Sequence, residues 1–380
     1  MKSSDLFSRT RLHLARAFNE FTQAELAEKI GVKQPYVGLL ETGRKQPSQM
    51  LAGAIADALG FEVGFFYEET PDEFRATDWS FRRYQSATAA TMNRVLAQGT
   101  LFLMLVGYLD VVLRLPKDTM PTIPRPTSRE EIERGSDHCR MQLGLGLDVP
   151  VNHVIRAFER AGVVVAAVNG TSGKIDAVSR AAGQRGVILV SDDKGSASRR
   201  RYDVGHEGGH LVMHVGVETG TPETESEANV FASAFLLPRR GFIREFPRPS
   251  RGFWKRSYWK DLFDMKKRWR VSAAAIVRRA FDLKMIDAAD YQRAYKFMSA
   301  QGWLKNGEPP ATEPEMEGPE MLPRTFSLLA SRLGISQRDV AESLHWKPSV
   351  LEKVSGIPIV EAAPVDAPRA KIIPISLSRG

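Results

Sequence analysis

The segment that decides the fold reads Arg199-Arg-Arg-Tyr-Asp-Val-Gly-His206-Glu207-Gly-Gly-His210-Leu-Val-Met-His214. It contains the spacing H-E-x-x-H, in which His206 and His210 are separated by one helical turn. Because residues at this spacing share a face of an α-helix, both imidazoles can reach one metal ion. Glu207 would then lie where a carboxylate can take a proton from water, and one further ligand would leave an open position typical of catalytic zinc. The pattern predicts a zinc-dependent peptidase.

A third ligand is expected from the next helical pattern, which begins near Glu223 and ends at a proline. Glu225 falls on a face that otherwise carries small residues, so its carboxylate could reach the metal where two helices pack closely. The interval from His210 to Glu225 is short, which leaves Glu223 and Glu227 as alternative ligands. His214 lies one turn beyond His210 and is expected to support a ligand or the core instead of binding metal.

The block around this motif resembles the ImmA/IrrE family of metallopeptidases. The matching residues are Arg201-Tyr202, His206-Glu207-x-Gly209-His210 with His214, and Glu225-x-x-Ala228-Asn229-x-Phe231-Ala232 ending in Leu236-Leu237-Pro238. The resemblance spans roughly residues 130–302 and implies a zincin-like domain. It also implies that Glu207 is the general base and that Zn²⁺, or Mn²⁺ in its place, is held by His206, His210 and Glu225.

One departure from that family lies inside the metal motif. Gly208 stands where the family carries a bulky aliphatic residue, and Gly209 follows it. Each glycine in a helix interior weakens the helix by roughly 1 kcal/mol. This pair therefore places catalysis, more than metal binding, in question.

The N-terminal part carries a different signature. Thr22 followed by Glu25 predicts a capping box at the start of a short helix. Gly31 supplies the conformational freedom for a tight turn, and a second helix is expected from Lys33 to Glu41, with Pro35 tolerated in its first turn. A helix, a short turn and a second helix that starts with polar residues is how a helix-turn-helix presents side chains to the major groove.

Over roughly the first sixty-five residues, this pattern resembles the XRE family of Cro/C1-type repressors. The matching residues are Thr22-Gln23-x-x-Leu26-Ala27-x-x-x-Gly31-Val32-x-Gln34-x-x-Val37-x-x-x-Glu41-x-Gly43-x-x-x-Pro47. The resemblance implies a five-helix domain that binds double-stranded operator DNA. Base edges would be met by Lys33, Gln34 and Tyr36. Phosphates would be met by Gln23, Arg44 and Lys45.

Two positions depart from the XRE pattern. Pro35 and Gly38 stand where the family more often carries polar residues, and both remove groove contacts. The alternative interpretation is a helical bundle that mediates only protein contacts.

Composition places limits on the whole chain. Its 380 residues suit two or three domains, and 43% hydrophobic with 26% charged residues is typical of a soluble globular protein. The net charge of +8 favours a polyanionic partner. A single cysteine, Cys139, excludes an internal disulfide, and the first residues have no secretory apolar core. We therefore expect a cytoplasmic protein.

The most apolar run extends from Leu101 to Leu113 and is interrupted by Gly107 and Asp110. It is too short to span a bilayer and predicts a helix buried between domains, without membrane contact. Two β-rich runs, residues 163–168 and 186–190, predict a small antiparallel sheet beside the metal helix.

The resulting fold class is α+β, predominantly α, with a helical C-terminal region. The expected parts are the helix-turn-helix domain (1–70), a helical connector (79–127), the metallopeptidase domain with a basic helical extension (128–305), a flexible acidic Pro-rich linker (306–324), a small helical segment (325–361) and a disordered tail (362–380).

Two features of the C-terminal third allow alternatives. The basic and aromatic stretch 239–279 could bind a nucleic-acid backbone, but Trp254, Leu262 and Trp269 favour a core stripe. Ser336-Gln-x-Asp-Val-Ala repeats the pattern of Thr22-Gln-x-Glu-Leu-Ala. A second helix-turn-helix-like fragment is thus an alternative, although no Gly-Val turn follows it.

The sequence therefore predicts a transcriptional regulator with a zinc endopeptidase domain. The resemblance implies cleavage of a partner repressor during stress or mobile-element induction. The alternative is a non-catalytic repressor or antitoxin whose peptidase-like domain is a sensor or dimerisation module. Self-cleavage is a third hypothesis, and the sequence also leaves a homodimer open.

Overall fold

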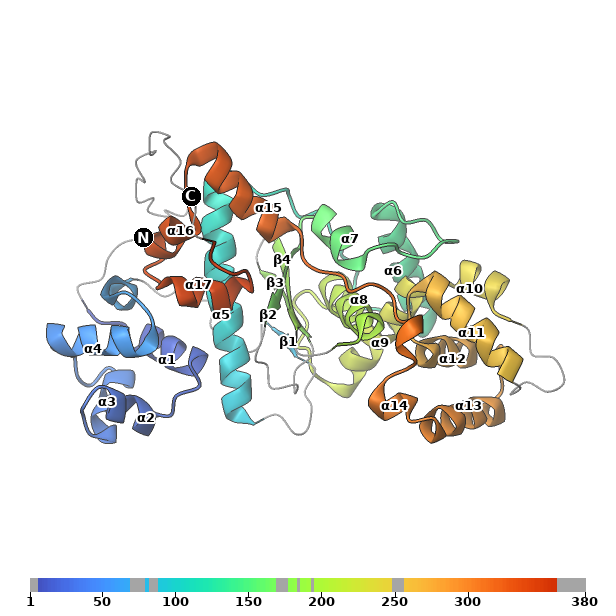
Figure 1. Cartoon of the computed structure of the whole chain (residues 1–380), viewed down its shortest axis with the longest axis horizontal. Helices are drawn as coiled ribbons and strands as arrows, with labels where there is room; N and C mark the ends of the chain where they lie inside the picture. The colour runs from blue at the N-terminus through green and yellow to red at the C-terminus, as the bar shows by residue number, and fades with distance from the viewer. Residues whose placement is uncertain are drawn as a thin grey trace.

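The computed structural model describes residues 6–68, 79–81, 88–168, 177–182, 185–192, 195–247 and 256–360. The chain is predominantly helical with one small sheet, as the sequence predicts. Figure 1 shows the N-terminal helices at one end, the sheet near the middle and helices α10–α14 at the other end. The predicted tail, residues 362–380, lies outside the described residues.

Five helical elements form the N-terminal domain, as expected, the last being a 3₁₀ helix. They are α1 (Arg9–Phe18), α2 (Gln23–Lys29), α3 (Gln34–Glu41), α4 (Gln49–Leu59) and η1 (Val63–Tyr67). The predicted capping box is present: Thr22 accepts from the Glu25 amide, and the Glu25 carboxylate accepts from the Thr22 amide. Gly31 lies in the turn between α2 and α3 with a φ of 69°, in the left-handed region that favours glycine.

Helix α5 (Ala89–Leu113) is 25 residues long and apolar enough to cross a membrane by length and composition, so the apolar segment is longer than the run from Leu101 to Leu113 on which the expectation rested. Within the protein, 56% of its most apolar window is buried. All residues from Val95 to Leu103 are buried, which means that the helix is enclosed on every side there. It packs against α1 and lies between the N-terminal helices and the sheet (Figure 1), as expected of a buried helix.

The sheet is mixed, so the prediction of an antiparallel sheet is wrong in part. Its order is β1-β3-β4-β2, with β1 (Ser80–Phe81), β2 (Val164–Val168), β3 (Ala177–Ala182) and β4 (Arg185–Ser191). β3 pairs antiparallel with β4 and β1, whereas β2 pairs parallel with β4. Helix α8 (Ala197–Met213) packs against β3 and β4, so the sheet does lie beside the metal helix.

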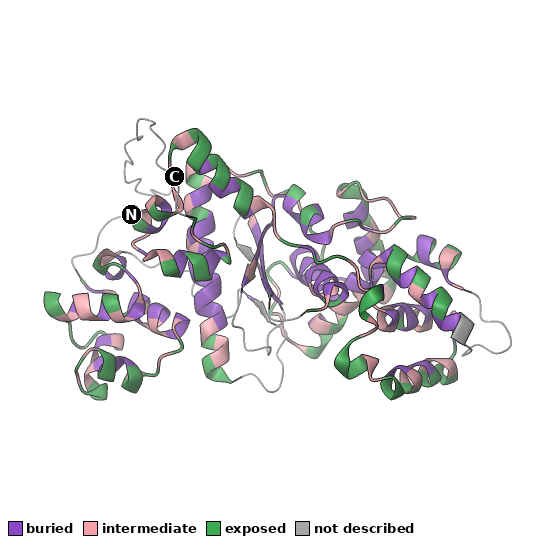
Figure 2. Ribbon diagram, in the orientation of Figure 1, coloured by how far each residue is buried: buried purple, intermediate pink, exposed green. Residues whose placement is uncertain are grey.

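The helices that pack around α8 hold the segment with His206 and His210 in position. α8 packs most extensively on α9 (Pro222–Leu236), which packs in turn on α6 (Arg129–Gln142). Arg140, fully buried on α6, donates to the carbonyls of Gly146, Val149 and Phe235, and so ties α6 to the end of α9. Figure 2 shows α8 buried along almost its whole length.

The next helices are α7 (Val154–Arg160), α10 (Arg239–Glu245), α11 (Arg256–Trp269), α12 (Ala273–Asp282), α13 (Ala288–Ala300) and α14 (Trp303–Asn306). Helix α7 packs on α8, and α11 to α14 pack on one another in sequence order. Leu262 and Trp269 have no exposed surface, so these two residues form core as favoured above, while Trp254 lies outside the described residues.

Residues 307–320, which we call the acidic strap, do not form the free connection expected of a flexible linker. Glu308 and Glu313 both pair with buried Lys266, and Glu317 pairs with buried Arg201. Glu313 also accepts from Ser198 at the start of α8. The strap therefore binds the peptidase-like domain along its length, through η3 (Pro310–Thr312), before the chain enters its last helices.

Those last helices lie beside α5 (Figure 1). They are α15 (Met321–Leu328), the π-helical turn η4 (Leu329–Leu333), α16 (Gln337–Ser343) and α17 (Pro348–Ser355).

Candidate metal centre and DNA-binding face

His206, His210 and Glu225 meet at the α8–α9 interface. The two Nε2 atoms of the histidines are 3.2 Å apart. The Glu225 carboxylate lies 3.2 Å from His206 Nε2 and 3.4 Å from His210 Nε2. All three ligand atoms lie within 4.8 Å of one another, so they can converge on a single ion.

The opposite ring nitrogens of both histidines have partners of their own. His206 Nδ1 lies 3.2 Å from Asn229 Oδ1, and the Asn229 amide donates to the Glu225 carbonyl, one turn earlier on α9. His210 Nδ1 lies 2.8 Å from His214 Nδ1. Partners of this kind fix the orientation of a ligating imidazole and leave its Nε2 directed at the metal.

A longer chain of contacts continues from His214. Its Nε2 lies 2.7 Å from Glu227, which pairs at 3.0 Å with Arg125. Glu227 is therefore occupied outside the cluster, and Glu223 is exposed, so of the three acids only Glu225 faces both histidines. Sequence reasoning did not find Asn229 or Arg125 as supports, because neither position carries a local signal for contact with a histidine.

The donor set fits a divalent cation. Beyond the two histidines, both buried carboxylate oxygens of Glu225 have no hydrogen-bond partner among the described residues, as is expected of atoms that bind an ion. Burial opposes ionisation of Glu225, but hydrogen bonds from His206 and His210 bring its pKa to about 2. Burial lowers the pKa of His210 to about 4, which keeps the imidazole neutral, as metal binding requires.

Glu207 lies on α8 between the two histidines and is 2% exposed. Burial raises the pKa of Glu207 to about 7, although the charge of His206 and the Ser179 hydroxyl offset part of the rise. Ser179 belongs to β3, so the sheet lies beside the carboxyl group. A carboxyl group with a pKa near neutrality can both accept and return a proton.

The two glycines of the motif have a packing reason. A Cβ atom at Gly208 would lie 2.3 Å from Cζ of Phe158, and one at Gly209 would lie 3.1 Å from Cβ of Phe231. Phe158 is fully buried and stacks on Phe235 at 5.3 Å. An aromatic ring from α7 thus occupies the space of the expected aliphatic side chain, and the glycines do not indicate a disrupted helix.

The residues expected to meet DNA come from α2, from α3 and from the segment that follows α3. Lys33 and Gln34 are exposed at the start of α3. Gln34 Nε2 donates to Gln23 Oε1 at 2.7 Å, and Gln23 Nε2 donates to Glu41 at 2.7 Å. This chain of amides aligns two side chains on neighbouring helices. A Cβ at Gly38 would lie 3.6 Å from Gln23 Oε1, an ordinary van der Waals contact, so this amide does not require a glycine there.

Glu41 anchors the network. It accepts from Arg16 at 2.6 Å and 3.0 Å, and hydrogen bonds from His13, Arg16 and Gln23 outweigh burial and hold its pKa at about 2. Sequence reasoning placed neither Arg16 nor Glu41 in this role.

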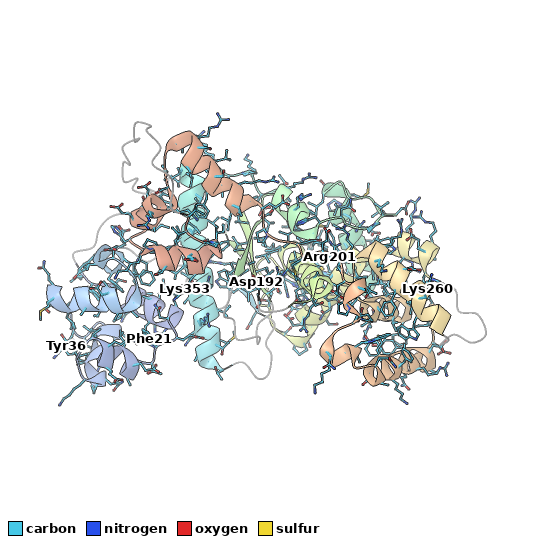
Figure 3. All side chains as sticks on the ribbon, in the orientation of Figure 1. Phe21, Tyr36, Asp192, Arg201, Lys260 and Lys353 are labelled. Atoms are coloured by element: carbon cyan, nitrogen blue, oxygen red, sulfur yellow. The ribbon has the colours of Figure 1, made fainter. Side chains whose placement is uncertain are left out.

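Three further expected residues lie in α3 or follow it. Arg44 and Lys45 are exposed after α3, and the Lys45 ammonium lies 5.1 Å from the centre of the Tyr36 ring. Tyr36 lies at the end of the molecule farthest from the peptidase-like helices (Figure 3). A duplex could therefore approach this end of the molecule without meeting the sheet or α8.

Models of known protein families match two separate regions of the chain. A helix-turn-helix family model matches residues 15–66, and a model of the IrrE N-terminal-like domain, a peptidase family, matches residues 158–281. No curated protein matches the chain. Both matches confirm the resemblances drawn from the sequence. The chain therefore joins an XRE-type helix-turn-helix domain to an IrrE-like peptidase-family domain.

Proposed function

We propose that the chain is a DNA-binding regulator whose IrrE-like domain is a zinc-dependent endopeptidase. The proposed substrate is a partner repressor, whose cleavage would relieve repression in a stress response or during mobile-element induction. The observation that carries the proposal is the convergence of His206, His210 and Glu225 beside the buried carboxyl group of Glu207.

The residues of the site have three proposed roles: metal binding, proton transfer and orientation of the imidazoles. His206, His210 and Glu225 would hold the ion, which when bound supplies Lewis acidity that polarises a peptide carbonyl and lowers the pKa of water. Glu207 takes a proton from the attacking water at its carboxylate and returns it to the leaving amine. Asn229 and His214 keep the two imidazoles oriented.

Metal content and cleavage test the enzyme separately. Glu207→Gln should retain one zinc per chain and lose cleavage of an XRE-type repressor encoded beside the gene. Glu223→Gln is the matched control, since this exposed carboxylate on the same helix as Glu225 takes no part in the cluster. Equal cleavage by Glu207→Gln would remove the mechanism. Wild-type protein without stoichiometric metal would favour a non-catalytic repressor whose domain is a sensor or dimerisation module.

One observation favours self-cleavage as a second candidate. Strand β1 already pairs with β3, with Ser80 opposite Ser179, the β3 residue that influences the pKa of Glu207. The adjoining Trp79 is buried, and its carbonyl accepts from Thr219 in the segment between α8 and α9. A part of the chain's own backbone thus runs along the strand edge nearest the proposed base. Incubation with zinc or manganese, followed by mass spectrometry of the intact chain, would reveal a cut; an unchanged mass would dismiss this candidate.

The DNA-binding half has an independent test. Lys33→Glu combined with Gln34→Ala should abolish binding to the operator in a gel-shift assay, because both side chains are exposed at the start of α3. Unchanged affinity would refute the assignment of this face.

A further inference from the structure

Residues 321–356, which we call the C-terminal unit, repeat the architecture of α1–α3 at a constant offset of 314 residues. Ser336 corresponds to Thr22 at that offset. Each of these residues caps a seven-residue helix through a capping box, which closes on Glu25 in α2 and on Asp339 in α16. The N-cap position of the helix that follows is occupied by Lys33 in the first unit and by Lys347 in the second, without a side-chain capping bond in either.

The turns and the core obey the same offset. Glu20 and Gly334, which precede α2 and α16, both have positive φ, at 58° and 66°. In the turn between the last two helices Gly31 has φ 69°, and His345 stands in its place with φ 56°. Residues buried at equivalent positions pair as Leu26 with Val340, Ala27 with Ala341, Val37 with Leu351, and Leu40 with Val354.

The positions that would read DNA differ between the units. Gln34 corresponds to Pro348, which has no polar side chain, and Tyr36 corresponds to Val350, which is 3% exposed. Lys33 is retained as Lys347, whose ammonium pairs with Asp57 at 2.7 Å. The C-terminal unit thus has the scaffold of a helix-turn-helix but lacks two of the three side chains proposed to reach base edges.

The turn of the C-terminal unit is instead paired with the N-terminal domain, just after α4. The Glu62 amide donates to the His345 carbonyl at 2.9 Å, and the Lys347 amide donates to the Gly60 carbonyl at 3.1 Å. Phe61 and Trp346 lie opposite each other in this short antiparallel bridge, and both are buried. Two main-chain bonds around a pair of buried rings make this a packed interface.

The other side of α17 is fixed to the peptidase-like half. Gln98 of α5 donates to the carbonyls of Lys353 and Val354 at 2.9 Å and 3.2 Å. A Cβ at Gly356 would lie 1.8 Å from the Ala167 carbonyl oxygen, so the end of α17 touches the backbone of β2. Figure 3 shows Lys353 beside α5, between the N-terminal domain and the sheet.

We infer that residues 321–356 are a second helix-turn-helix unit whose reading face has become a protein-binding surface, and that its partner is the α4–η1 corner of the first unit. The interface binds residues 57–62 of the same chain and leaves Lys33 and Gln34 exposed. Only the first unit can then bind DNA, and it does so while joined to the peptidase-like half.

Charge reversal at equivalent positions distinguishes the two units. Lys33→Glu should weaken binding of the full chain to short random-sequence duplexes by about tenfold or more, because the reversed charge repels the phosphate backbone. Lys347→Glu should change it by less than about twofold, because Lys347 faces Asp57. If Lys347→Glu weakens binding as strongly as Lys33→Glu, the C-terminal unit reads DNA and the inference fails.

Cross-linking tests the docking itself and does not depend on DNA binding. Asp57→Cys with Lys347→Cys, in the full chain, should form an intramolecular link with a short bismaleimide, detected by peptide mass spectrometry. Cys139 is fully buried and will not compete. The single variants and the double variant in urea are the controls. Absence of the link in the folded double variant would overturn the inference, even if the proposed DNA binding holds; loss of DNA binding alone would overturn only the proposed function.

Discussion

Substitution of Gly208 by alanine tests whether an aromatic ring has replaced the aliphatic side chain in the metal helix. The added Cβ would lie 2.3 Å from Phe158 Cζ and 3.0 Å from both Cε atoms. Phe158 cannot easily withdraw, because it is fully buried and stacked on Phe235. Overpacking of a core costs about 1–3 kcal/mol. The ordinary gain from glycine to alanine in a helix is roughly 1 kcal/mol, so we expect a net loss of about 1 kcal/mol.

Gly107→Ala is the matched control. Gly107 lies in α5 and is exposed, and a Cβ added there would have no other atom within 4 Å among the described residues. The same substitution at this position should stabilise the protein by up to about 1 kcal/mol. The free energy of unfolding would be measured for both variants by urea titration followed by circular dichroism.

A double-mutant cycle tests whether Phe158 is the residue that clashes with the Cβ added at position 208. Phe158→Ala alone should cost about 3–5 kcal/mol, as expected for a buried phenylalanine. In that background Gly208→Ala should no longer destabilise, which gives an interaction energy of about 1–2 kcal/mol between the two positions. If Gly208→Ala instead stabilises the wild-type protein as much as Gly107→Ala does, the packing argument is refuted.

Three further predictions concern the supports of the metal helix and the acidic strap. Burial raises the pKa of Glu159 from 4.5 to about 7. The stabilisation by its protonated form is therefore complete below pH 4.5 and is lost as the pH rises through 7. Glu159→Gln should flatten the dependence of the unfolding free energy on pH between about 4.5 and 7. His214→Phe removes the partner of His210 Nδ1. The affinity for zinc, measured by competition with a chelating indicator, should fall about 10–100-fold. Unchanged affinity would show that His214 does not orient His210. Glu317→Ala leaves Arg201 buried without its counter-charge and should cost about 3–5 kcal/mol in a denaturant titration; a loss below about 1 kcal/mol would contradict the buried pairing.

Local signals predicted much of the structure. The capping box at Thr22, the helix that carries His206 and His210, and the helix that carries Glu225 all depend on residues within a few positions of one another. Such patterns record the helical period and the needs of a helix start, which are the same in most folds.

The contacts missed from the sequence join residues far apart in the chain. Gly208 makes sense only beside Phe158, which lies in another helix. β3 reads Ala-Val-Ser-Arg-Ala-Ala, with Val178 as its single β-branched residue and no aromatic residue, so it gives a weak strand signal. The acidic strap has the composition of a linker, yet its carboxylates pair with buried cations from distant segments. Glu317, for example, pairs with Arg201, which lies 116 positions earlier in the sequence. The second helix-turn-helix was obscured because His345 adopts the left-handed turn conformation for which a glycine is expected.

These long-range contacts form one continuous path between the two candidate sites. Glu313 and Glu317 hold the first turns of α8, and the strap that carries them leads directly into α15 and the C-terminal unit. That unit ends the path at Gly60 and Glu62 of the DNA-binding domain. A ligand shifts a conformational equilibrium only by its difference in affinity for the two states. DNA could therefore influence the metal centre through this path only if the bound domain changes its contact with His345 and Lys347. The packing of α5 on α1 is a second connection between the N-terminal domain and the rest of the chain.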